Sequence, residues 1–138
     1  MTTTTSTTVP FLDLVAQHDE VAEAVNADLA QVFATAGFVG GPHVAAFEQA
    51  YARFCGVDHC VGVGNGTDAV ELALRALGVG QGDEVITAAN TFVATVEAIV
   101  RAGATPVLVD VDDETLLIDP QAVAAAVTPR TAAVVPVH

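Results

Sequence analysis

The chain contains no lysine: its four basic residues are all arginines, against 17 Asp and Glu. The resulting net charge of -13 argues against a protein that binds along the phosphate backbone of a nucleic acid. A P-loop is also excluded, because that motif places a lysine directly after its glycines. Any phosphate group that this chain binds must therefore be held locally, by backbone dipoles.

Other scarcities limit the class of protein further. Although 52% of the residues are hydrophobic, no apolar stretch is long enough to span a bilayer. Residues 2–8 are only Thr and Ser, unlike a signal peptide, so we expect a disordered Thr-rich tail over residues 1–8 and a cytoplasmic location. Cys55 and Cys60 have no second pair to complete a zinc site, and no metal site is expected. We interpret them as two buried free thiols.

Segments of helical and strand periodicity alternate along the chain. Strands are expected near 60–63, 85–88, 106–110 and 132–137, and helices near 21–33, after Pro42, and near 67–77, 91–102 and 120–127. Apolar strands that alternate with helices predict an α/β fold in which helices cover a parallel sheet. Because the pattern demands another helix after His138, we expect the domain over residues 9–138 to be incomplete at its C-terminal end.

The turn Gly64-Asn65-Gly66-Thr67-Asp68 joins an expected strand to an expected helix. Such a turn presents unpaired backbone N–H groups and the positive end of a helix dipole to an anion. Gly66, Thr67 and Asp68 are the candidate phosphate donors, and the Thr67 hydroxyl is a further donor. The alternative is a helix that is merely capped after a tight turn.

Three other segments follow strands at the edge of the sheet where open parallel sheets bind ligands. Phe92 is a candidate for stacking on a planar cofactor ring, with a core or hydrophobic-staple phenylalanine as the alternative. The acids at 110, 112 and 113 are more typical of residues that cap the end of a strand than of a metal site. His138 is a candidate substrate contact.

Several ordered motifs over residues 9–138 resemble one known family. They are Val9-Pro10-Phe11-Leu12-Asp13-Leu14, Gly40-Gly41-Pro42 with Phe47-Glu48, Phe54-Cys55-Gly56-Val57, the run Val61 to Ala69, Gly82-Asp83-Glu84-Val85-Ile86, Asn90 to Thr95, Gly103-Ala104-Thr105-Pro106-Val107 and Thr128-Pro129-Arg130-Thr131. Together they resemble the N-terminal part of the DegT/DnrJ-type sugar aminotransferases, which depend on pyridoxal phosphate and have fold type I.

The resemblance implies a three-layer α/β/α sheet, the large domain of fold type I transferases. It implies that the cofactor phosphate binds the amides around Gly66, Thr67 and Asp68, and that the pyridine ring stacks on Phe92. The Asp68 carboxylate is expected to turn away from the phosphate dianion. In the family, the Schiff-base lysine and the aspartate that pairs with the pyridinium nitrogen lie further along the chain, so no catalytic residue is expected in this segment.

The resemblance also implies a reaction for the complete protein. Family members move an amino group, from a donor such as glutamate, onto a nucleotide-linked keto sugar, usually as homodimers. The 138 residues alone are expected to be inactive. Three alternatives remain open: a related sugar dehydratase with histidine at the lysine position, a non-catalytic regulator of the same fold, and a binding module for a small phosphorylated ligand.

Overall fold

The computed structural model describes Val9 and residues 11–138, and the Thr-rich tail expected over residues 1–8 lies outside the described residues. The chain divides at Gly62 into two compact units, each of which is described by itself. No helix in the described part of the chain is long and apolar enough to cross a membrane.

The first unit consists of helices α1 (Leu14–Asp19), α2 (Ala22–Thr35) and α3 (Pro42–Cys55). Pro42 occupies the first turn of α3, as expected, because its missing N–H would lack an intrahelical acceptor there in any case. Ala52 is the only buried residue among the described residues of this unit. The two thiols are free but not buried, since Cys55 is exposed at the end of α3 and Cys60 is half-buried. The expectation of buried thiols was therefore wrong.

The strand expected near residues 60–63 is absent. This segment is irregular in the structure, and Val61 is 77% exposed. A strand forms only where a neighbour accepts its backbone hydrogen bonds, and no strand of the described chain pairs with these residues. A short apolar run shows the preference for a strand but not the presence of a partner.

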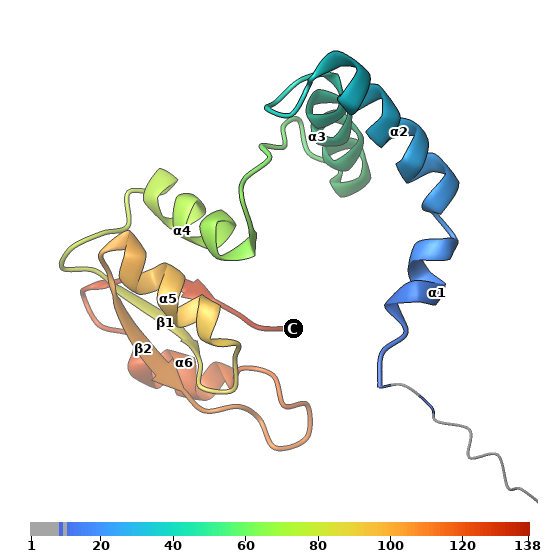
Figure 1. The fold of residues 1–138 in the computed structure, drawn as a ribbon. Helices are drawn as coiled ribbons and strands as arrows, with labels where there is room; N and C mark the ends of the chain where they lie inside the picture. Colours follow the sequence, from blue (N-terminus) through green and yellow to red (C-terminus); the bar gives the residue numbers. More distant parts are fainter. Residues whose placement is uncertain (1–8, 10) are drawn as a thin grey trace, which may run out of the picture. The chain divides into compact units, whose positions relative to one another are not determined.

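The second unit carries a parallel sheet and confirms the predicted α/β class. Its strands are β1 (Glu84–Ala88), β2 (Thr105–Val109) and β3 (Thr131–Val135), in the order β2-β1-β3 (Figure 1). Glu84 pairs with Thr105 on one side and with Thr131 on the other. Helices α4 (Gly66–Ala76), α5 (Val93–Ala102) and α6 (Pro120–Ala126) complete the unit.

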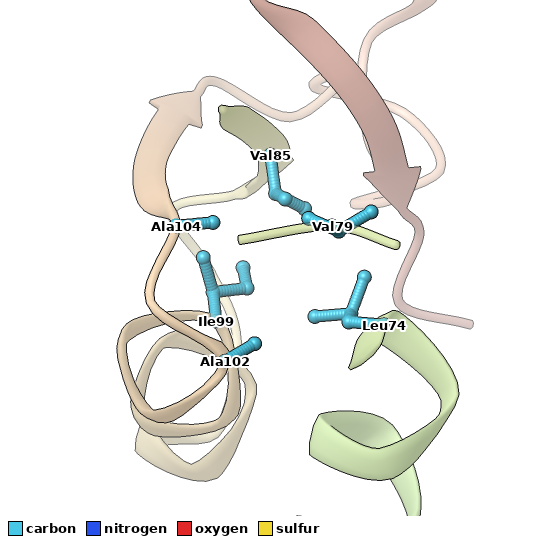
Figure 2. Close-up of a cluster of buried hydrophobic side chains, with 6 residues drawn as sticks. All are labelled: Leu74, Val79, Val85, Ile99, Ala102 and Ala104. Carbon is cyan, nitrogen blue, oxygen red and sulfur yellow. The ribbon is translucent and has the colours of Figure 1, made fainter. Parts of the chain in front are cut away.

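The helices form layers on the two faces of this sheet. From β1, the chain crosses through α5 to β2 and returns through α6 to β3, in the opposite direction across the sheet. Two right-handed crossovers in opposite directions place their helices on opposite faces. Figure 2 shows the core on the α4 and α5 face, where Leu74 and Ile99 approach Val85. The neighbouring Ile86 points to the other face and is also fully buried.

A polar clamp joins the starts of β1 and β3. Glu84 is 8% exposed, and its carboxylate accepts a hydrogen bond of 2.5 Å from the Thr128 hydroxyl and forms an ion pair with Arg130. The Thr128 hydroxyl first, and then the Arg130 guanidinium, hold the pKa of Glu84 below its ordinary value. This clamp lies at the amino ends of the strands, so the carboxyl ends are left for a ligand.

Candidate functional site

A hollow of about 450 Å³ lies beyond the carboxyl end of β1, where the first turns of α4 and α5 meet. Its lining comprises Asn65, Gly66, Thr67, Val70, Phe92, Ala94 and Thr95. Three of the four residues predicted to bind a cofactor therefore share one hollow, although Phe92 follows Thr67 by a full helix and a strand. The parallel sheet brings them together, because it directs the segment after β1 toward the start of α4.

The first turn of α4 supplies unpaired hydrogen-bond donors to this hollow. Asn65 is the N-cap, and its side-chain oxygen accepts a hydrogen bond of 2.9 Å from the amide of Asp68. The amides of Gly66 and Thr67 donate to no other described residue. A Cβ added to Gly66 would meet no atom within 4 Å, so the wall is open at this position. Helix capping and anion binding are therefore compatible here, because they use different amides.

Phe92 supplies an aromatic surface. It is the N-cap of α5, in extended conformation with φ -69° and ψ 139°, and is 76% exposed. That exposure argues against the core or staple phenylalanine considered as the alternative. The hydroxyl groups of Thr91 and Thr95 lie 2.8 Å apart and fix the turn on which Phe92 is held.

Asp68 lies in the same first turn, but its carboxylate does not line the hollow. One carboxylate oxygen is 3.1 Å from Arg101 Nη2 of α5, and the other accepts a hydrogen bond of 3.0 Å from the Asn65 side chain. The amide of Asp68 is already paired with Asn65, which leaves the Gly66 and Thr67 amides as the open donors. The cofactor-binding role of all four residues stays a prediction.

The acids after β2 were interpreted as residues that cap the end of the strand, and Asp110 and Asp112 accept backbone hydrogen bonds there. One Asp112 oxygen accepts hydrogen bonds from the Thr115 amide and hydroxyl and from the Glu114 amide. These bonds, led by that of the Thr115 amide, hold the pKa of Asp112 below its ordinary value. Asp110 accepts from the amide of Val111 at 2.8 Å. No group of acids, histidines or cysteines in the described chain is arranged to hold a metal ion.

His138 is exposed beyond the end of β3 and does not line the hollow. Its role as a substrate contact stays a prediction. Sequence reasoning missed Asn65, which lines the hollow, and Arg101, which contacts Asp68 beside it. Asn65 was detectable, because an Asn three residues before an Asp resembles a capping box. Arg101 was not, because it contacts Asp68 across 33 residues of sequence.

Comparison with known proteins places the chain in a family. The model of the DegT/DnrJ/EryC1/StrS aminotransferase family matches residues 19–138. The chain belongs to this family. The predicted resemblance is thereby confirmed, and so is the fold class, since solved members share the architecture.

Three relatives of the family illustrate the match. The erythromycin biosynthesis sensory transduction protein EryC1 of Saccharopolyspora erythraea is 48% identical over 94% of this chain and 36% of its own length. The dTDP-3-amino-3,4,6-trideoxy-alpha-D-glucose transaminase of Streptomyces venezuelae is 45% identical over 94% and 34%. The solved structure of NtdA from Bacillus subtilis, with bound cofactor PMP, has a TM-score of 0.88 at 36% identity, over 99% and 32%. The chain thus spans about a third of the length of these relatives.

The family uses pyridoxal phosphate, and the hollow has groups that suit the phosphate and the ring of this cofactor. Two first-turn amides without acceptors suit a phosphate, and an exposed aromatic ring on the same wall suits a pyridine ring. The absence of lysine from the chain is no obstacle to phosphate binding, since helix amides bind anions without a basic side chain.

Proposed function

We propose that residues 63–138 form the phosphate-binding and ring-binding walls of the pyridoxal phosphate site of a sugar aminotransferase. The observation that carries this proposal is the single hollow in which the open amides of Gly66 and Thr67 lie with the exposed ring of Phe92. Membership of the family supports the choice of pyridoxal phosphate over other phosphorylated ligands.

Each residue has a distinct task in this proposal. The Gly66 and Thr67 amides, with the Thr67 hydroxyl, bind the phosphate, and the open space at Gly66 lets it approach the backbone. The Asn65 cap keeps the first turn in shape, so that these donors are arranged before the ligand arrives. Phe92 covers one face of the pyridine ring and excludes water from it. Pyridoxal phosphate, when bound, supplies the electron sink through which an amino group passes from donor to acceptor.

For the complete protein we propose transfer of an amino group, with glutamate as donor, onto a nucleotide-linked keto sugar. The dTDP-sugar transaminase among the relatives supports this substrate class. We propose also that the protein acts as a cytoplasmic homodimer; the two free thiols fit a reducing compartment. Because the 138 residues contain no lysine, we propose that this segment alone does not transaminate.

The first test is a titration of the protein, as its gene encodes it, with pyridoxal phosphate, followed by absorbance and by the phosphorus NMR signal. Thr67→Val removes a hydroxyl donor, and Phe92→Ala is expected to weaken binding by about tenfold through the lost ring contact. Phe54→Ala is the matched control, because Phe54 is 84% exposed but belongs to the first unit. Saturable binding that responds to Phe92 and not to Phe54 supports the site, and absence of binding overturns it.

The second test separates the reactions that the fold supports. The coding DNA beyond codon 138 is read for the residue at the position of the Schiff-base lysine. A lysine there supports the aminotransferase, and a histidine would point to a dehydratase. Absence of the lysine would favour a non-catalytic regulator. The name of the EryC1 relative, a sensory transduction protein, supports that alternative.

A further inference from the structure

Arg101, in the last turn of α5, is the centre of a charge network beside the first turn of α4. Its guanidinium lies 3.1 Å from Asp68, 2.7 Å from Glu71 and 3.7 Å from Glu97. The second arginine of the network, Arg75, pairs with Glu71 at 2.9 Å and donates to the backbone carbonyl of Arg101. Three carboxylates are therefore balanced by two arginines, and only Arg101 reaches Asp68 in the described chain.

The position of the Asp68 carboxylate is fixed from several directions. Arg101 binds one oxygen, the Asn65 side chain binds the other, and Gly64 leaves the space that the second oxygen occupies. A Cβ at residue 64 would lie 2.8 Å from that oxygen, which is closer than such atoms approach each other. The carboxylate is thus held on the Arg101 side, outside the lining of the hollow.

This arrangement matters because Asp68 follows directly after the two residues with open amides. A carboxylate in the first turn of a helix is itself attracted to the helix dipole, so it competes with any anion that binds there. Removal of Arg101 would leave three carboxylates against one arginine beside the hollow. Repulsion between such charges is strong where they lie a few ångströms apart and partly out of water.

We propose that Arg101 is a positioning residue for the cofactor phosphate: it holds the Asp68 carboxylate out of the hollow and neutralises it. Arg101 does not touch the ligand, and it acts through Asp68. This inference rests on the proposed pyridoxal phosphate site. It accounts for how a chain with net charge -13 and no lysine keeps the carboxylate next to the open amides from competing with a dianion.

A purely structural role predicts a different result. If Arg101 only ties α5 to α4, its loss would disturb the whole hollow, and ligands with and without a phosphate would be weakened alike. If Arg101 controls the Asp68 charge, only the phosphorylated ligand would be weakened. Pyridoxine 5′-phosphate and pyridoxine are a suitable pair of probes, because neither carries an aldehyde that reacts with protein amines.

The experiment measures both affinities by calorimetry on the protein as its gene encodes it. Arg101→Gln is expected to weaken pyridoxine 5′-phosphate by about tenfold, since an uncompensated carboxylate beside the site repels a dianion, and to leave pyridoxine within about twofold. Asp68→Asn in the Arg101→Gln background removes the repelling charge and is expected to restore most of the loss. Arg75→Gln is the matched control, because Arg75 shares Glu71 with Arg101 and makes no contact with Asp68.

Gly64→Ala tests the same idea without removing a charge. Its Cβ must displace the Asp68 carboxylate, so phosphate-specific weakening is again expected, with recovery in the Gly64→Ala/Asp68→Ala double variant. This pair keeps the test decisive if Arg101→Gln does not fold. Equal weakening of both ligands, or no recovery on removal of the Asp68 charge, would overturn the role of Arg101. Failure of the unmodified protein to bind pyridoxine 5′-phosphate would instead overturn the proposed function.

Discussion

Glu84 links the stability of the sheet to pH through its hydrogen bond with Thr128 and its ion pair with Arg130. Its folded pKa lies below the ordinary value of 4.5, so the folded state binds protons less readily than the unfolded chain. The stabilisation is therefore present above about pH 4.5 and is lost as the pH falls through the lower folded pKa.

The expected result is a smaller acid-induced loss of stability in Glu84→Gln than in the unmodified chain, because the variant has no carboxylate to protonate. Urea unfolding between about pH 7 and pH 3.5 measures this difference. Glu114→Gln is the control, since its side chain is exposed and only its backbone amide contacts Asp112. An identical pH slope in Glu84→Gln and the unmodified chain would contradict the prediction.

Among single residues, sequence patterns located some of those at the hollow and missed others. The shared place of Gly66, Thr67 and Phe92 in one hollow was predicted from a helix start and from the end of a strand, although the strand expected before Gly66 is absent. Arg101 was not predictable, because a helix stripe gives its face but not the neighbour that its guanidinium reaches. The exposure of Cys55 was equally hidden, since burial depends on what packs against the end of α3.

Among the elements, α4 begins at a residue whose side chain caps it. Asn65→Ala removes the acceptor for the Asp68 amide and is expected to destabilise the chain by about 1 kcal/mol. Asn90→Ala is the matched control, because Asn90 is exposed and lies outside any helix. Urea unfolding of both variants measures the change in the free energy of unfolding. Equal midpoints for the two variants would show that the cap does not stabilise α4.

The sequence predicted an element best where the periodicity and the ending residue that mark it lie within or directly after that element. The stripe from Val70 to Leu77 and the glycine after it located α4, since the φ of +81° at Gly78 is what ends the helix. The six-residue helix α1 was missed, because six residues are too few to show a helical period. The prediction of a strand at 60–63 was wrong, because a strand forms only when a second segment pairs with it, and an apolar run does not show whether that segment exists.

For the molecule as a whole, burial is concentrated in the second unit. Every buried hydrophobic residue of the described chain except Ala52 lies after Val63. Amide hydrogen exchange on the 138-residue chain should therefore show the slowest exchange in β1 and α5. Helix α5 buries Ala98, Ile99 and Ala102, whereas α2 buries none of its residues, so these two helices form an internal comparison. Equal protection of α2 and α5 would contradict this expectation.

The strand order has a consequence for the newly made chain as it leaves the ribosome. β1 is the central strand, yet neither of its neighbours is joined to it by a hairpin, and both are synthesised after it. Glu84 first gains a partner when Thr105 emerges, and its other edge stays open until Thr131 follows. A pause in translation between these two points would expose the edge of an apolar strand to other chains. The interval between the synthesis of β2 and that of β3 is thus a stage at which one edge of β1 stays unpaired.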